Sequence, residues 1–527
     1  MIYQANTPLL MGIDAGTSRV RVLLFEVDGT LVAEASDEPP VKRPRTGWTS
    51  TEAEDLLKSC LKAIRSVVAM VDKPERIRSV AVASVAEAGV PTDADGDAVY
   101  PIIAWYDSRT QPQAHWLKKH IGEERLFRIT GLNLYPIFGL CKQLWIRENA
   151  PEAFNKTVRW LNTADFLAWK LCGVPATDYS LASRTFALNI QNLEYANELL
   201  EEVGIPCNWY QTLVPSGTFL GNVLPETSKI TGLSLDCKVS SGGHDHLVGA
   251  LIAGATNQGT LINSMGTAEA VTLFMDKPID DKAIGAQGYV QGVIVVDRPY
   301  YYYLGGLFTS GGAVQWFHRL TEQRYSHEEL IKDAWKISPG ANGVLFLPQM
   351  RIGSPPNPAE MSRGAFIGLG TDTDHTVLYR SMLEGMAFDV KMILEGISKL
   401  KKVPEIENIH CFGGESRNDL LMKIKASVLN RALTKMDMPE TVSLGAAILG
   451  GIGAGIFTNL QEAINGLRFN TYEILPQSEW VEPYQKFYDD VYSDAWKQIR
   501  PLQEKLLKVF PPNDNDSKYC KLKQFKD

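Results

Sequence analysis

The sequence predicts an α/β protein of two domains with a cleft between them. Three observations lead to this fold class. The chain has 527 residues, which is too long for one ordinary hydrophobic core. Its first hundred residues alternate between strand and helix patterns. A glycine turn of the same type also follows an apolar strand in each half, as Asp14-x-Gly16-Thr17 and as Asn263-x-x-Gly266-Thr267. Two related units of this kind would leave a cleft between them.

The first strands and helix follow from apolar patterns. Residues 9–13 predict a strand that ends at Asp14, residues 20–27 a second one and residues 31–35 a third. Asp28-Gly29 predicts the hairpin turn between the second and the third. Apolar residues recur at helical spacing from 56 to 68, so we expect a helix there with Thr51 as its N-cap. Residues 80–84 predict a further strand.

The second half opens in a similar way. A strand at residues 238–241 leads into Gly242-Gly243-His244-Asp245, and one at residues 260–264 leads into Gly266-Thr267. We place the domain boundary near residue 250, so residues 1–250 form the first domain and residues 251–490 the second. Residues 491–527 are expected to form a C-terminal helix and then a loose tail, since residues 513–527 have no periodic apolar face.

Composition excludes several function classes. A net charge of −8 argues against a nucleic-acid-binding face. The seven cysteines are scattered without a CxxC pair, which argues against disulfides and zinc and favours a reducing cytoplasm. The first eight residues lack a basic signal region, and the longest apolar stretch, residues 444–457, is too short to span a bilayer. We expect a cytoplasmic protein without nucleic-acid or membrane partners; a homodimer is left open.

The turn that follows Asp14 has the chemistry of a phosphate site. Its glycine allows a tight turn, the backbone N–H groups and the hydroxyls of Thr17 and Ser18 can hold phosphate oxygens, and Asp14 can hold Mg²⁺ through water. The alternative is an ordinary β-hairpin turn. The chain has no Walker loop at a suitable place.

A second candidate is Asp245. A carboxylate after two glycines suits a general base beside a bound hydroxyl, whereas the alternative is a helix N-cap. His244 and His246 have no third metal ligand at a useful spacing, so hydrogen-bonding roles are expected for them. Two more glycine turns, at residues 309–312 and 412–418, could each place a helix N-terminus against an anion or a flat base.

Taken together, these turns form an ordered series that resembles the FGGY carbohydrate kinases of the actin-like ATPase superfamily. The resemblance covers about residues 10–480. It is carried by Asp14-x-Gly-Thr, Trp105-x-Asp107-x-Arg109, Gly243-x-Asp245, Gly266-Thr267, Gly311-x-x-x-Gln315-Trp316, Gly413-Gly414-x-x-x-Asn418 and Ser443-Leu444-Gly445-Ala446-Ala447. It implies two ribonuclease-H-like domains, a sugar held mainly by the first, ATP between them, and transfer of a phosphoryl group to a hydroxyl of the sugar.

The resemblance also implies roles for individual residues. Asp14 would position the Mg²⁺ of Mg·ATP, and Asp245 would be the catalytic base. The substrate would be held by Glu87, Trp105, Asp245 and His246. The nucleotide and its phosphates would be held by Thr17, Ser18, Arg21, Gly266, Thr267, Gly311, Gln315, Gly414, Glu415 and Asn418.

The substrate itself stays open at this stage. Glycerol kinases carry Arg-Glu where this chain has Ala86-Glu87, and Tyr where it has Ile137, which puts glycerol in doubt. The Met-His pair of xylulokinases is also missing, whereas the Gly-His-Asp sequence at 243–245 is similar to fuculokinase-like members. Ketopentoses, deoxyketohexoses and four- or five-carbon polyols remain candidates.

Two alternatives belong to other classes: a non-catalytic actin-like or chaperone-like ATPase, and a kinase that has become a sugar sensor. Asp245 and Trp105 weigh against the ATPase, because a nucleotide switch needs no carboxylate beside a polyol pocket. The intact Asp14, Asp245 and Gly-Thr turns weigh against the sensor.

Overall fold

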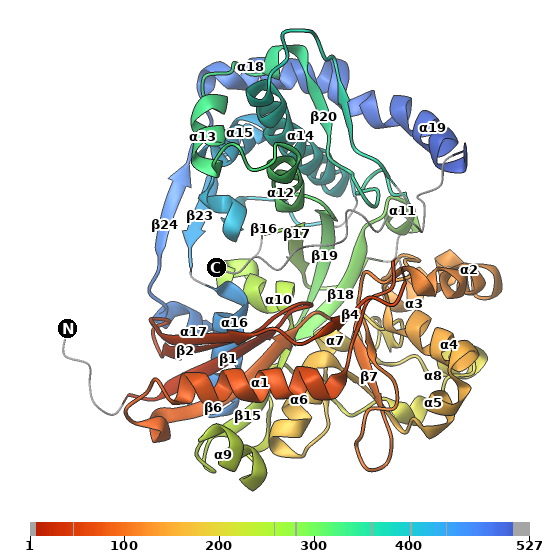
Figure 1. Ribbon diagram of the computed structural model, residues 1–527, viewed down its shortest axis with the longest axis vertical. Helices are drawn as coiled ribbons and strands as arrows, with labels where there is room; N and C mark the ends of the chain where they lie inside the picture. The colour runs from red at the N-terminus through yellow and green to blue at the C-terminus, as the bar shows by residue number, and fades with distance from the viewer. Residues whose placement is uncertain are drawn as a thin grey trace.

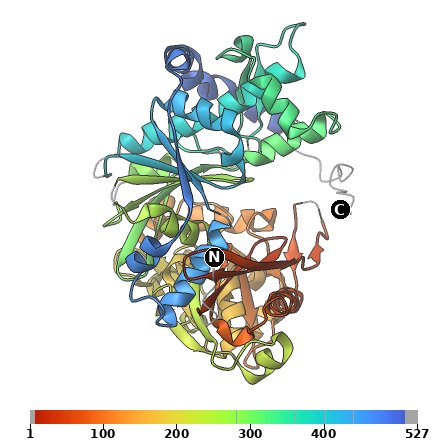
Figure 2. The same cartoon turned by 90° about the vertical axis from the view of Figure 1, so that its left-hand side faces the viewer.

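Two β-sheets, each covered by helices, form the two lobes of the protein (Figures 1 and 2). The computed structural model describes residues 7–45, 47–257, 259–279, 282–359, 362–400, 403–438 and 440–509. The two sheets and their helices confirm the predicted α/β fold class. The predicted tail at residues 513–527 lies outside the described residues.

The first sheet has six strands and makes up the lower lobe in Figure 1. The strands in spatial order are β14 (Phe219–Asn222), β15 (Lys238–His244), β6 (Ile77–Ser84), β1 (Leu9–Ala15), β2 (Val20–Glu26) and β3 (Leu31–Asp37). The central strands β15, β6 and β1 run parallel, whereas β1, β2 and β3 form the antiparallel meander that the sequence predicts.

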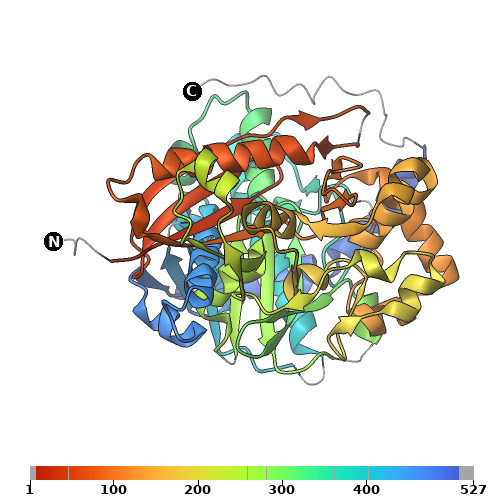
Figure 3. The same ribbon diagram turned by 90° about the horizontal axis from the view of Figure 1, so that it is seen from below.

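Alternating side chains of β1 serve two different cores, because successive residues of a strand point to opposite faces. Leu9, Met11 and Ile13 pack with the helices on one face. Leu10 belongs to the cluster on the other face. The helices of the first face are α1 (Ala53–Val68), α6 (Thr163–Cys172) and α9 (Pro225–Thr231). Figure 3, seen from below, shows α1 across the bottom of this lobe.

The opposite face of the first sheet is covered by a helix from late in the chain, α16 (Thr441–Gly453). Figures 1 and 3 show this segment among the strands of the lower lobe. The approach to β1 is so close that a Cβ atom on Gly12 would lie 1.8 Å from the backbone oxygen of Ser443. Glycine at position 12 therefore lets helix and sheet pack backbone to backbone.

The second sheet has seven strands and lies in the upper lobe. In spatial order they are β18 (Val290–Val295), β19 (Pro299–Leu307), β17 (Glu269–Met275), β16 (Thr260–Met265), β22 (Asn408–Phe412), β23 (Leu433–Asp437) and β24 (Asn470–Ile474). Strands β16 and β22 run parallel and are both followed by glycine turns.

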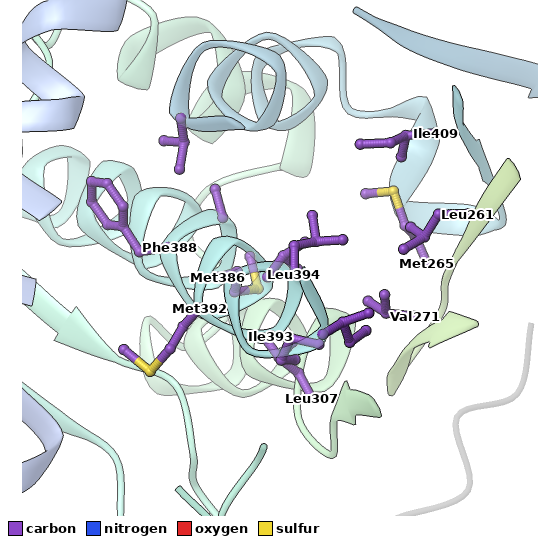
Figure 4. Packing of buried hydrophobic residues seen from close by; sticks show 14 of the residues in the cluster. Leu261, Met265, Val271, Leu307, Met386, Phe388, Met392, Ile393, Leu394 and Ile409 are labelled. Atoms are coloured by element: carbon purple, nitrogen blue, oxygen red, sulfur yellow. The ribbon is translucent and has the colours of Figure 1, made fainter. Parts of the chain in front are cut away.

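The long helix α14 (His375–Ser398) is the centre of the upper lobe. Figure 4 shows Met386, Ile393 and Leu394 of this helix beside Leu261 and Val271 of the sheet. The helices packed around it are α12 (Gly311–Leu320), α13 (His327–Ala334), α15 (Asp419–Leu429), α18 (Ser478–Phe487) and α19 (Ser493–Val509). Twenty of its residues are buried, so the helix packs against neighbours on nearly every side, and its buried charged residues Arg380, Glu384 and Asp389 are held by hydrogen bonds.

A third apolar cluster joins the two sheets. It combines Leu10 and Phe25 of the first sheet with Ile262 and Tyr302 of the second, together with α16 and α10 (Asp245–Ala250). The chain passes from β15 to β16 through α10 and the π-helical segment Leu251–Ala255. The proposed domain boundary near residue 250 falls in this connection, and the division into residues 1–250 and 251–490 stays a prediction.

A helical region projects from the lower lobe beside the end of the second sheet. It contributes Tyr135, Ile137 and Phe138 to the interior between the lobes. Its helices are α2 (Gln111–His120), α3 (Glu123–Thr130), α4 (Gly139–Asn149), α5 (Pro151–Lys156), α7 (Tyr179–Ala182) and α8 (Asn197–Glu202). None of the helices in the described part of the chain is long and apolar enough to cross a membrane.

One predicted helix start is wrong. Helix α1 begins at Ala53 with Glu52 at the N-cap position, and no side chain caps it. Thr51 cannot serve as the cap because it belongs to strand β5 (Ser50–Thr51), which pairs with β4 (Val41–Lys42) and β8 (Ile102–Ile103). Tertiary strand pairing has overridden a local capping signal.

We predict that Gly12→Ala separates α16 from the first sheet and destabilises the protein by at least about 3 kcal/mol, the upper end for overpacking, because backbone rather than a flexible side chain blocks the new methyl group. Thermal unfolding would measure this. Gly466→Ala is the matched control, since a Cβ there meets nothing within 4 Å. Equal melting temperatures for the two variants would contradict the predicted role of Gly12.

Candidate active site

Three carboxylates lie at one edge of the first sheet because three parallel strands end there. Asp14 of β1 stands in register with Ala83 of β6, and β15 ends in register with Ser84. Glu87 follows β6 and Asp245 follows β15. The carboxyl ends of parallel strands are where α/β proteins bind ligands. The sheet thereby gathers residues that are far apart in sequence.

Asp245 is the first residue of helix α10, and the N-cap position belongs to His244. The alternative interpretation of Asp245 as the helix cap is therefore wrong. Its Oδ1 accepts a hydrogen bond from the backbone N–H of His246 at 2.6 Å and lies 3.2 Å from Nε2 of His244. Burial raises the pKa of Asp245, but His246 and His244 outweigh it and bring the pKa down to about 2. This carboxylate is ionised at neutral pH.

Close packing against the neighbouring strand explains why glycines precede Asp245. The ladder between β15 and β6 is irregular between Ser240 and Gly243. A Cβ atom on Gly242 would lie 1.8 Å from the backbone oxygen of Val82. Only glycine fits this bulge. The bulge changes the direction of the end of β15, and so the position of His244 and of Asp245, which follows it.

His246 is neutral at physiological pH. Burial lowers its pKa, and the nearby Asp245 offsets this effect only in part. The described residues contain no group of three or more histidine, cysteine and carboxylate side chains that could hold a metal ion. The Nε2 atom of His244 contacts Asp245, and the hydrogen-bonding roles expected for the two histidines otherwise stay a prediction.

Glu87 forms a buried ion pair that the sequence did not indicate. Its Oε1 accepts bonds from Nε and Nη2 of Arg184, at 2.8 and 2.6 Å. Both side chains are less than a tenth exposed. Burial raises the pKa of Glu87, but Arg184 and His244 outweigh it and leave the pKa below its ordinary value.

These residues line one cavity of about 250 Å³. Four residues predicted to bind the substrate meet there, namely Glu87, Trp105, Asp245 and His246. Other walls come from both lobes. They include Tyr135, Ile137, Phe138 and Arg184 of the lower lobe and Glu269, Gly305, Leu307 and Phe308 of the upper lobe. Tyr135 and Phe308 meet edge to face across it, with ring centroids 6.3 Å apart.

Trp105 connects this cavity to the first glycine turn. Its indole N–H donates to the Thr17 hydroxyl at 3.2 Å. The loop that carries Trp105 is fixed by Asp107, which accepts two side-chain bonds from Arg109 at 2.8 and 2.9 Å. The Arg109 guanidinium lies 4.3 Å from the centre of the Trp48 ring. Asp107 and Arg109 thus support the loop from within the protein.

Asp14 has an unusual electrostatic environment. Burial, the charge of Asp245 and the charge of Glu440 raise its pKa to about 7, although Arg21 opposes the shift. Arg21 itself is ion-paired with Glu440, which stands at the N-cap position of α16 in the left-handed region with φ 47°. The close packing of α16 on β1 therefore brings an acidic residue from late in the chain to the first glycine turn.

The second glycine turn is tied to a helix start. The N–H groups of Gly311 and Gly312 donate to the backbone oxygens of Gly266 and Thr267, at 3.1 and 3.0 Å. Ser310 N–H also donates to Thr267, at 3.0 Å. Three predicted nucleotide residues, Gly266, Thr267 and Gly311, therefore lie together. Gln315 lies exposed on the same helix, α12.

The remaining predicted nucleotide residues follow β22. Gly414 is exposed and begins a 3₁₀ turn that ends at Arg417. Asn418 is buried and caps α15, since its side chain accepts from the backbone of Leu421 at 3.1 Å. Glu415 is half-buried, and burial and the charge of Glu269 raise its pKa. Asn418 has a structural role whatever its role toward a nucleotide.

A buried network missed by sequence reasoning fixes the second turn. Glu269 accepts bonds from Asn263 and Ser310, each at 2.8 Å, and forms a fully buried ion pair with Lys425. It therefore connects β16, α12 and α15. Neither Glu269 nor Arg184 has a local sequence signal, because the partners Lys425 and Glu87 are supplied by distant segments.

The residues around Asp14 fit a hydrated divalent cation. A buried carboxylate whose pKa is raised by two neighbouring carboxylates gains stability from a nearby positive ion. Mg²⁺ keeps several of its waters and needs only one or two carboxylates when phosphate oxygens supply the rest. The absence of a dense ligand cluster in the described residues is compatible with that mode.

Comparisons with known proteins agree with this arrangement. Residues 9–252 match the N-terminal domain of the FGGY family of carbohydrate kinases, and residues 261–454 match its C-terminal domain. A xylulose kinase of Bacillus subtilis (strain 168) is 27% identical over 505 residues, which cover 96% of this chain and 99% of the relative. A glycerol kinase of Staphylococcus haemolyticus (strain JCSC1435) is 28% identical over 480 residues, with 89% and 94% covered. The ligand-bound xylulose kinase of Lactobacillus acidophilus has the same fold, with a TM-score of 0.86 at 20% identity over 94% of this chain and 99% of that one.

We predict that Asp14→Asn stabilises the ligand-free protein while weakening Mg·ATP binding. The pKa of this carboxyl is near its ordinary 3.8 in the unfolded chain and about 7 in the folded protein. Its ionisation therefore lowers the free energy of unfolding. This effect is absent below pH 3.8 and increases up to about pH 7. The melting temperature should rise by about 2–4 °C at pH 8 and by less at pH 5. The exposed Asp236→Asn serves as control. A lower melting temperature for Asp14→Asn at pH 8 would show that its charge is compensated in the free protein.

Proposed function

The chain belongs to the FGGY family of carbohydrate kinases, and from this membership we propose that it transfers the γ-phosphoryl group of ATP to a hydroxyl of a small ketose or polyol. In this proposal Asp245 is the general base, and Mg·ATP binds between the lobes. The observation that supports this proposal most is that an ionised Asp245 lines the cavity between the lobes, while its charge helps to raise the pKa of Asp14 at the first glycine turn.

Asp245 would accept the proton of the attacking hydroxyl. Its pKa of about 2 makes it a weak base, so the proton can move only as the new O–P bond forms. His244 and His246 fix the direction of the carboxylate, through the contact of Nε2 and through the backbone bond. Precise alignment is the main contribution that phosphoryl transfer asks of a protein.

The phosphates of ATP would bind at the two glycine turns. Thr17, Ser18 and Arg21 flank the first turn, and Gly266 and Thr267 form the second, which is joined to the start of α12. Helix starts and glycine turns present N–H groups to anions. Asp14 would hold the Mg²⁺, which when bound neutralises charge on the phosphates. The exposed Gln315 and Gly414 would contact the rest of the nucleotide.

The sugar would occupy the cavity beside Asp245. Trp105 offers an indole face for a carbon chain. Glu87 is already held by Arg184 through one oxygen, Oε1, so its other oxygen remains as an acceptor for a substrate hydroxyl. The named relatives act on xylulose and on glycerol, so membership alone leaves the substrate class wide.

A panel of ketoses, polyols and sugar acids in a coupled assay for ADP tests the proposal. We expect at least one ketose or polyol to stimulate ADP release and to yield a phosphorylated product by mass spectrometry. ADP release that no sugar stimulates would instead favour a nucleotide-coupled switch.

We predict that Asp245→Asn lowers kcat by about 10²–10⁴-fold, the usual contribution of general-base catalysis. Mg·ATP affinity should change little because Asp245 lies in the sugar cavity, and sugar binding should persist or weaken. Steady-state kinetics and nucleotide titration measure both quantities, and thermal unfolding checks the fold. Turnover within a few-fold of the original protein would rule out Asp245 as the base.

A further inference from the structure

A buried serine of helix α7 is bonded to the backbone of the strand that leads to Asp245. The Ser180 hydroxyl oxygen accepts a hydrogen bond from the backbone N–H of His244 at 2.8 Å. His244 is the last residue of β15 and directly precedes Asp245. Ser180 is completely buried, and the described residues that line the cavity do not include it. Its connection to the cavity therefore runs through the backbone of His244.

The end of β15 needs this serine because only one neighbouring strand reaches that far. On one side, β15 pairs with β6 up to its last residue, where His244 lies opposite Ser84. On the other side, the ladder with β14 ends at Ser240. A buried backbone N–H group requires an acceptor. The Ser180 hydroxyl supplies that acceptor for His244 where β14 has already ended.

The Ser180 hydroxyl has a fixed direction because Asp178 binds its hydrogen. The hydroxyl donates to Oδ1 of Asp178 at 3.0 Å. The same Oδ1 accepts from the backbone N–H of Leu181 at 2.9 Å, and Oδ2 accepts from the Ser216 hydroxyl at 2.7 Å. A serine hydroxyl has a single hydrogen, so with that hydrogen directed to Asp178 its lone pairs remain for the N–H of His244.

Close packing adds to the hydrogen bond at this strand end. A Cβ atom on Gly243 would lie 2.8 Å from the Ser180 hydroxyl oxygen, so the serine lies directly against the residue before His244. The His244 side chain in turn places Nε2 at 3.2 Å from Oδ1 of Asp245. The position of the His244 backbone therefore determines from where its imidazole contacts the Asp245 carboxylate.

We propose that Ser180 is a positioning residue for phosphoryl transfer, an inference that rests on the proposed kinase function. Asp178 holds the Ser180 hydroxyl, and the hydroxyl holds the backbone of His244. His244 then sets the direction in which the Asp245 carboxylate meets the attacking hydroxyl. A misplacement of about 1 Å can slow a reaction about 100-fold, so turnover should depend on this support. A purely structural role would change only the fraction of protein that is folded.

Ser180→Ala tests the inference because it removes the acceptor for the His244 N–H. With the best sugar of the panel, and at a temperature where thermal unfolding shows the variant to be folded, kcat should fall about 10- to 100-fold. The KM values for sugar and ATP should stay nearly unchanged. Ser381→Ala is the matched control, because Ser381 is 1% exposed and donates to the backbone oxygen of Leu378 at 2.8 Å in α14. An unchanged kcat in Ser180→Ala would overturn the inference and leave the kinase function intact.

A double-mutant cycle shows whether Ser180 acts through Asp245. In an Asp245→Asn protein the base is already absent, so adding Ser180→Ala should lower kcat by no more than about twofold. A further loss as large as the one in the original protein would mean that Ser180 acts by another route, and the inference would be wrong.

Ser180→Cys decides the question if the alanine variant does not fold. A thiol fills a similar space but is a weaker hydrogen-bond acceptor than a hydroxyl. We expect kcat to fall about three- to tenfold with both KM values unchanged, a smaller effect of the same kind as that of a misplaced base. A kcat equal to that of the original protein would overturn the inference. If the original protein phosphorylates no sugar, the kinase function and this inference are both refuted.

Discussion

Burying several carboxylates in one cleft requires a fixed positive or hydrogen-bonding partner for each, because an unpaired buried charge is costly. Glu87 has Arg184, Glu269 has Lys425, and Asp245 has its two histidines. Asp14 lacks a cation of its own, since Arg21 is shared with Glu440. Among Asp14, Glu87 and Asp245, only Asp14 has a raised pKa, and it is the one proposed to hold a cation.

The partners of these carboxylates come from distant segments, so pairing also fixes the shape of the cleft. Arg184 follows the short helix α7 and is paired with Glu87 in the turn after β6, whereas Lys425 of α15 is paired with Glu269 of β17, the strand that follows the second glycine turn. Tyr302 of the upper lobe contributes to the pKa of Arg184 in the lower lobe. The cavity consequently depends on both lobes, and a change in their relative position would alter its walls.

Sequence patterns predicted the strand ends and the turns because these are local: a carboxylate or glycine pair after an apolar run indicates the end of a strand wherever it occurs. The resemblance to the family implied that Glu87, Trp105, Asp245 and His246 serve one site, and these residues do line one cavity. Local patterns alone did not imply this. Sequence patterns could not identify Arg184 or Glu269, because the role of each depends on an ion-pair partner that only the fold brings close. The prediction of Thr51 as a helix cap was wrong for the same reason, because the strand partners of this residue lie far away in sequence.

The placement of α16 has a consequence for the order in which the chain can fold during synthesis. The first sheet is complete when residue 244 has been made, but one of its faces is covered only by residues 441–453. At about 5–20 residues per second, roughly 10–40 s separate the two events on the ribosome. During that interval Leu10, Leu23 and Phe25 lack their late-made neighbours. This apolar face of the nascent chain therefore stays incompletely covered until α16 has been made.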